Sequence, residues 1–178
     1  MEIGFLPCGI PVNQPTPLLP LSKERRSRMN SDLIELLRAF IEHEVKYLIV
    51  GAYAFGVHVE PRTTKGMDLF TRSDEENIKA VFRALAQYGA PLVSFTPADF
   101  TDGTVFQIGQ PPERIDIMQD IDGISFDEAW ESRVEGLLDG QTPAHVISRE
   151  HLIQNKLAVG RLQDLADVGK LRESALEG

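Results

Sequence analysis

Residues 47–70 read YLIVGAYAFGVHVEPRTTKGMDLF, and this stretch decides the fold that we expect for the rest of the chain. The run from Tyr47 to Val50 is apolar and rich in large and β-branched side chains, which predicts a short buried strand. Gly51 ends this strand and allows a tight turn. The small and aromatic residues 52–58 then predict a short helix, and residues 67–70 predict a second strand.

Two aspartates lie inside predicted strands. Asp68 stands among apolar residues in the second strand of the opening stretch. Asp116 lies in the middle of residues 114–118, which we predict to pair with residues 104–108 as a hairpin or as adjacent antiparallel strands. A carboxylate within an apolar strand costs free energy unless it is ion-paired, hydrogen-bonded or bound to a metal. The two aspartates are therefore the first candidates for a functional site.

The residues around these aspartates support two explanations. Two carboxylates on one face of a sheet can hold a divalent cation such as Mg²⁺, which is commonly shared with substrate phosphates. The glycine turn leads into a helix N-terminus, whose free N–H groups can bind phosphate. In the other explanation the acids are structural, with Asp68 ion-paired to Arg62 or Lys65 and Asp116 ion-paired to Arg114.

The composition is that of a globular protein. Of the 178 residues, 42% are hydrophobic and 25% are charged, so we expect one domain with a sizeable core. We assign this domain to residues 29–178 and predict that residues 1–28, which contain five prolines, form an extended or disordered arm. Met29 follows a basic cluster and is a second candidate for the native start.

Charge and residue usage exclude several classes of protein. The net charge of −9 argues against a generally basic surface for nucleic acid, and the chain carries no DNA-binding signature. A single cysteine, Cys8, excludes a cysteine-based zinc cluster. No apolar run approaches the roughly 20 residues that span a bilayer, so no membrane partner is expected. We expect a cytoplasmic protein.

Capping residues predict where the other helices begin. An amphipathic helix is expected to start at Asn30 or Ser31. Ser-x-x-Glu capping boxes predict helices at Ser73 and Ser125, and Ser148 is expected to cap a further helix.

The last helix is expected over residues 161–171. Its spacing predicts an inward apolar face and an outward acidic face, formed respectively by Leu162, Leu165, Val168 and Leu171, and by Asp164 and Asp167. With the other elements, this predicts an α/β (α+β) fold that has a small mixed sheet, flanking helices and a C-terminal helical portion.

The stretch LIVGAYAFGVHVEPRTTKGMDLF resembles the opening motif of the nucleotidyltransferase superfamily, which has the DNA polymerase beta-like fold. It resembles in particular the small bacterial members related to minimal nucleotidyltransferases and AbiEii-type toxins. This family shows an apolar strand, Gly-Gly or Gly-Ser, a short helix and then Asp-x-Asp on the next strand. Gly51 and Ala52 stand where the glycine pair belongs, Asp68 where the second acid belongs, and Asp116 resembles the third acid.

A C-terminal stretch, ISREHLIQNKLAVGRLQDLADVGKL, is similar to another part of the family pattern. That pattern has a lysine followed by Arg-x-x-Asp-x-x-Asp, which Lys156, Arg161, Asp164 and Asp167 match. The resemblance covers about residues 29–171, and the combination of three separated motifs makes it fairly specific.

The resemblance implies metal-dependent transfer of a nucleoside monophosphate from an NTP to a protein or RNA hydroxyl. Asp68 and Asp116 would be the catalytic acids and the ligands of Mg²⁺ or Mn²⁺. Five other residues would contact the nucleotide, namely Gly51, Ala52, Arg62, Lys65 and Lys156.

Gly66 departs from the family pattern, because it stands where the family has its first aspartate. Loss of one metal ligand should lower the rate by orders of magnitude. The alternative function is therefore a catalytically inactive nucleotide-binding or regulatory module, for example of a toxin–antitoxin-like pair. Gly66 could also be a change in an otherwise complete enzyme. The acceptor, the preferred nucleotide and the oligomeric state are left open by the sequence.

Overall fold

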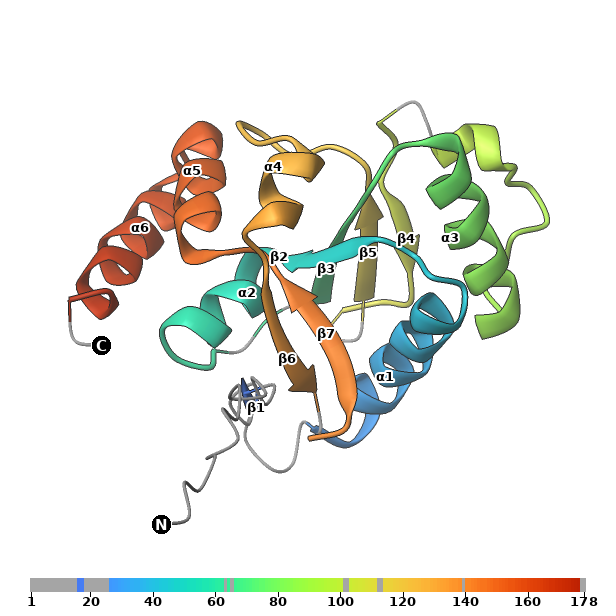
Figure 1. Cartoon of the computed structure of the whole chain (residues 1–178), viewed down its shortest axis with the longest axis horizontal. Coiled ribbons are helices and arrows are strands. Elements are labelled where there is room, and N and C mark those ends of the chain that lie inside the picture. The colour runs from blue at the N-terminus through green and yellow to red at the C-terminus, as the bar shows by residue number, and fades with distance from the viewer. Residues whose placement is uncertain are drawn as a thin grey trace, which may run out of the picture.

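The computed structural model describes residues 16–17, 26–62, 64, 66–100, 103–111, 114–138 and 140–176. These residues form a mixed α/β fold, in which helices flank one seven-stranded sheet (Figure 1). The elements in chain order are β1 (Thr16–Pro17), α1 (Arg26–Glu42), β2 (Tyr47–Val50), α2 (Gly51–His58), β3 (Gly66–Thr71), α3 (Glu75–Tyr88), the 3-10 helix η1 (Pro97–Phe100), β4 (Phe106–Ile108), β5 (Arg114–Met118), α4 (Phe126–Glu131), β6 (Val134–Leu138), β7 (Thr142–Val146), α5 (Arg149–Val159) and α6 (Leu162–Ser174).

The sheet has the strand order β1-β6-β7-β2-β3-β5-β4. In its centre β2 runs antiparallel to β3, and β3 runs parallel to β5. On one side β5 pairs antiparallel with β4, and on the other side β2 pairs parallel with β7. The predicted strands 47–50 and 67–70 and the predicted pairing of 104–108 with 114–118 are confirmed, since they correspond to β2, β3, β4 and β5.

Apolar burial explains the positions of the central elements. Every residue of β2 is buried, as expected for a continuous apolar run. Helices α1 and α3 pack on each other beside the strands, while α5 and α6 lie beyond the opposite side (Figure 1). The end of α2 lies against the start of α5, where Arg149 Nη2 donates to the backbone oxygen of His58 at 3.3 Å. The His58 Nε2 atom also lies 2.7 Å from the backbone oxygen of Ile147, which precedes α5.

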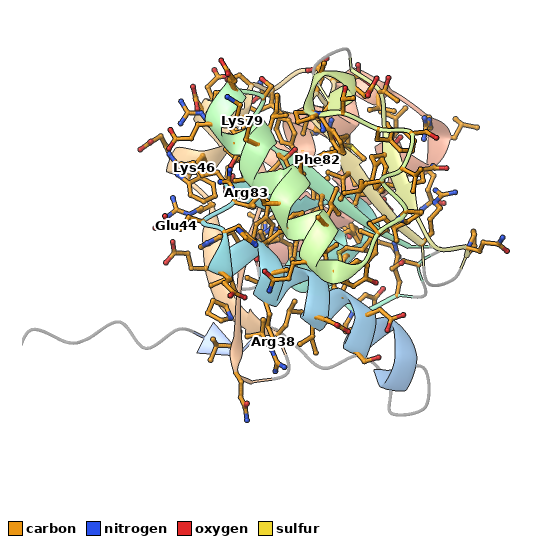
Figure 2. The ribbon with its side chains drawn as sticks, turned by 90° about the vertical axis from the view of Figure 1, so that its right-hand side faces the viewer. Arg38, Glu44, Lys46, Lys79, Phe82 and Arg83 are labelled. Atoms are coloured by element: carbon orange, nitrogen blue, oxygen red, sulfur yellow. The ribbon has the colours of Figure 1, made fainter. Side chains whose placement is uncertain are left out.

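The outer face formed by α1 and α3 carries charges of both signs. Figure 2 labels Lys79 and Arg83 on α3, and Lys46, which follows the turn after α1. Glu44, in the turn after α1, is also labelled there, and Lys79 forms an ion pair with Glu75 within α3. This face is therefore a solvent-exposed surface that carries charges of both signs.

The observed helix starts confirm two of the predicted caps and contradict two others. Helix α1 begins at Arg26, before the predicted cap at Asn30 or Ser31 and inside the predicted arm 1–28. The remainder of that arm lies outside the described residues, apart from β1, which pairs with β6. The predicted Ser73 capping box is wrong, because Asp74 caps α3 by accepting a hydrogen bond from the Asn77 N–H. The capping box at Ser125 and the cap at Ser148 are confirmed.

Helix α6 presents a different face to the core from the one predicted. Val168 and Leu171 are buried as expected, but Leu162 is 88% exposed and Leu165 is 46% exposed. Asp167, which was expected to face outward, is only 1% exposed. The physical reason lies in the buried cation Lys156 of α5, which binds this aspartate and turns the acidic face of α6 inward.

No helix among the described residues is both long and apolar enough to span a membrane.

Candidate functional site

The two predicted acids lie side by side at the centre of the sheet. Asp68 of β3 and Asp116 of β5 are register partners on adjacent parallel strands. Side chains at matched positions of neighbouring strands project from the same face, so the two carboxylates share one side of the sheet. The pairing of β3 with β2 on its other side places Asp68 opposite Val50, the last residue of β2.

Gly51 connects this acidic pair to the N-terminus of α2. Its φ angle is +64°, a left-handed conformation that glycine adopts without steric cost. A Cβ atom at this position would collide with the Oδ2 atom of Asp68 and would lie 3.1 Å from its Cγ atom. The turn therefore requires glycine for two reasons, and it brings the first turn of α2 against the Asp68 carboxylate.

The acidic pair has an excess of negative charge. The Oδ2 atom of Asp116 accepts a hydrogen bond of 2.7 Å from Arg114 Nη2. Its Oδ1 atom is buried and has no hydrogen-bond partner among the residues that the structure describes. Burial raises the pKa of Asp68, and the negative charge of Asp116 raises it further, against the opposing charges of Arg114 and Lys156. A cation between the two carboxylates would relieve both the repulsion and the unpaired oxygen.

The donor set fits a magnesium ion that is shared with a ligand. Within the described ranges, no group of three or more His, Cys, Asp or Glu side chains could hold a metal ion. The described residues therefore offer a pair of carboxylates and no complete cage. Magnesium is commonly bound in this way, with one or two carboxylates and with water and substrate phosphates as the other ligands.

The backbone at Gly66 leaves no room for a third acid. Gly66 of β3 is the register partner of Arg114 of β5. A Cβ atom on Gly66 would collide with the backbone oxygen of Arg114 and would lie 3.2 Å from its carbonyl carbon and 3.3 Å from its Cβ atom. Both obstacles are close to the chain axis, so an aspartate here would require β3 and β5 to shift.

Two of the predicted phosphate ligands meet on one buried carboxylate. The Nη1 and Nη2 atoms of Arg62 donate to the two oxygens of Asp167, at 2.7 and 2.9 Å. Lys156 Nζ donates to Asp167 at 2.7 Å and to Asp164 at 3.1 Å. Gln163 Nε2 donates a fourth hydrogen bond to Asp167, at 3.0 Å. Lys65, the remaining predicted cation, lies outside the described residues.

The pKa of Asp167 reflects this environment. Burial alone would raise the pKa of this carboxyl. The hydrogen bonds from Arg62, Lys156 and Gln163, together with the charge of Lys156, outweigh burial and hold the pKa below its usual range. The ionised form of Asp167 is therefore favoured at the centre of a charged cluster.

The cluster lies close to the acidic pair. Lys156 is near enough to lower the pKa of Asp68 by its charge. Ala52 and Arg62 line one shallow pocket, together with Tyr53, Gly56 and Thr64. The structure thus brings Gly51, Asp68 and Asp116 together where β2 meets α2, whereas Arg62 and Lys156 meet on Asp167. The sequence did not predict that Asp167 accepts hydrogen bonds from both Arg62 and Lys156. The occurrence of Lys156 and Asp167 in the same C-terminal motif was the one signal that could have indicated their contact.

Comparison of the chain with models of known protein families finds no match, and comparison with curated proteins finds none either.

Proposed function

We propose that the chain binds a nucleoside triphosphate with Mg²⁺ or Mn²⁺ and transfers the nucleoside monophosphate to a protein or RNA hydroxyl, at a rate limited by Gly66. The observation that carries this proposal is the pairing of Asp68 with Asp116 beside the Gly51 turn. A strand, a glycine turn, a short helix and two acid-bearing strands follow in the order that the resemblance implies. Because NTPs are cytoplasmic, the proposal places the chain in the cytoplasm.

Each part of the site has a role in this reaction. The acceptor oxygen forms a bond to the α-phosphorus, the bond from that phosphorus to the β-bridging oxygen breaks, and pyrophosphate leaves. The proton of the hydroxyl passes to the carboxylate pair and then to water. The divalent cation supplies neutralisation of the phosphate charge when it is bound. Asp68 and Asp116 would hold this cation. The free N–H groups at the start of α2 would orient the phosphates, and the methyl group of Ala52 would limit their approach.

A second function is favoured by two other observations. Position 66 has no space for a carboxylate, and both described cations, Arg62 and Lys156, are already bound by Asp167. A site with one acid missing can retain nucleotide binding and lose turnover, since catalysis needs interactions made only in the transition state. In this second function the chain is a nucleotide-binding or regulatory module, for example in a toxin–antitoxin-like pair.

Two measurements on the same variants separate these functions. The first is binding of ATP with and without Mg²⁺, and the second is transfer of label from each of the four α-labelled NTPs to proteins and RNA of a cell lysate. The variants are Asp68→Asn and Asp116→Asn, which remove charge with little change of shape. Asp120→Asn is the matched control, because it removes an exposed carboxylate beyond the far end of β5.

The outcomes are distinct. Transfer by the native chain and the control, with loss in both site variants, supports the transferase. Magnesium-dependent binding that the site variants lose, without transfer, supports the binding module. Binding that is absent, or that the site variants retain unchanged, contradicts both functions.

A further inference from the structure

The cations that a nucleotide would need are held by carboxylates of the same chain. Arg62 uses both terminal nitrogens on Asp167, and its guanidinium lies 4.3 Å above the ring centroid of Phe55, which fixes its plane. Lys156 is 5% exposed and donates to Asp167 and Asp164. The four side chains form what we call the latch cluster, which consists of Arg62, Lys156, Asp164 and Asp167.

The latch cluster has no net charge, because two cations face two carboxylates. An incoming triphosphate is therefore attracted to this end of the molecule only weakly, although two cations lie there. The acidic pair Asp68 and Asp116 adds further repulsion of anions in the absence of a metal. The cations become available to phosphate only if their internal partner withdraws.

The hydrogen bonds to Asp167 resemble those that a phosphate group receives. Donors from three separate places, the loop after α2, helix α5 and the first turn of α6, converge on its two oxygens. A planar fork from arginine and a point charge from lysine are the usual donors to phosphate oxygens. The donors that converge on Asp167 are therefore of the kind that can hold a phosphate group.

We propose that Asp167 is an internal substitute for phosphate, which keeps the site in a low-affinity state until a phosphate group of the nucleotide displaces it from Arg62 and Lys156. This inference rests on the proposed function and adds a regulatory device to it. Asp164 completes the device, since it also binds Lys156 and its Oδ2 atom is buried without a hydrogen-bond partner in the described part of the chain. Lys156 can therefore exchange one acidic partner for the other.

The probe for this inference is inorganic tripolyphosphate, titrated calorimetrically without divalent cations. This choice makes the test independent of Asp68 and Asp116 as metal ligands, so that the inference and the proposed function can fail separately. We expect Asp167→Asn to bind tripolyphosphate about tenfold or more tightly than the native chain. The reason is that Arg62 and Lys156 are no longer bound to a carboxylate at position 167 and become available to the phosphate groups. Asp120→Asn, which removes the same charge elsewhere, should leave the affinity unchanged.

A second pair of variants protects the test from loss of folding. Asp164→Asn breaks one hydrogen bond of the cluster and should give a smaller gain in affinity in a chain that melts normally. Arg62→Ala combined with Asp167→Asn should cancel the gain, because the released cation is absent. Unchanged or weaker tripolyphosphate binding in the folded Asp164→Asn and Asp167→Asn chains would overturn the proposal and leave the latch cluster a structural ion-pair network.

Discussion

The close contact between Gly66 and β5 predicts that side chains at position 66 destabilise the fold. In Gly66→Ala the new methyl group would collide with the backbone oxygen of Arg114. Overpacking of this kind costs about 1–3 kcal/mol. Replacing glycine removes conformational freedom from the unfolded chain and returns about 0.4–1 kcal/mol. At the centre of these two ranges, the expected net loss in the free energy of unfolding is about 1.3 kcal/mol, or about 3–5 °C in Tm for a chain of this length.

Gly66→Asp adds a charge to the same collision. Its carboxylate would stand two residues before Asp68 on the same strand face, near two acids that already repel each other. We therefore expect Gly66→Asp to be less stable than Gly66→Ala in the absence of divalent cations, and to recover part of the difference in Mg²⁺. Any transferase activity that it gains should depend on that recovery.

These differences in the free energy of unfolding are measured by urea denaturation of the native chain and both variants. Each protein is measured with and without about 10 mM Mg²⁺. Gly66→Ala is the matched control, because it contains the steric change without the charge. If Gly66→Ala is as stable as the native chain, β3 and β5 accommodate a side chain at this position. The explanation of the missing acid by lack of space is then refuted.

The remaining predictions concern the acids of the site. Asp167→Ala leaves Arg62 and Lys156 without their shared anion. It should lower the free energy of unfolding, measured in urea, by about 3–5 kcal/mol. A loss below about 1 kcal/mol would contradict a tightly bound cluster. The raised pKa of Asp68 means that its ionisation destabilises the folded state, an effect that is absent below the ordinary carboxyl pKa of 3.8 and grows as the pH rises through the folded pKa. Asp68→Asn should therefore raise Tm at pH 7 and change it little at pH 3.5, and the opposite order would show that the pKa is lowered. Gly51→Ala should lower Tm and weaken nucleotide binding together, because the left-handed φ and the contact with Asp68 both oppose a Cβ atom; a variant that melts normally would refute the close approach.

Local chemistry made the centre of the fold predictable. The apolar run 47–50, the glycine after it and the alternation around Asp116 are short-range signals, and they gave the strands, the turn and the shared face of the two aspartates. The structural explanation of the acids holds for Asp116, which is ion-paired to Arg114. It does not hold for Asp68, which has no ion pair among the described residues and lies beside Gly51.

The orientation of α6 could not be predicted in this way. Its leucines are spaced as in a buried face, and periodicity alone favours burying them. The observed orientation depends on contacts between residues far apart in the chain, since Asp167 binds Arg62 from a loop 105 residues earlier. A buried acid is stable only with its cations in place, and helical spacing does not identify those cations.

The pairing of Asp68 with Asp116 as a cation and nucleotide site is tested most directly by calorimetric titration of ATP into the native chain, Asp68→Asn, Asp116→Asn and Asp120→Asn, each with and without Mg²⁺. We predict that Mg²⁺ strengthens ATP binding to the native chain and to Asp120→Asn, and that this strengthening disappears in the two site variants. Equal magnesium dependence in all four proteins would show that the acidic pair does not hold the cation, and would contradict the proposed function.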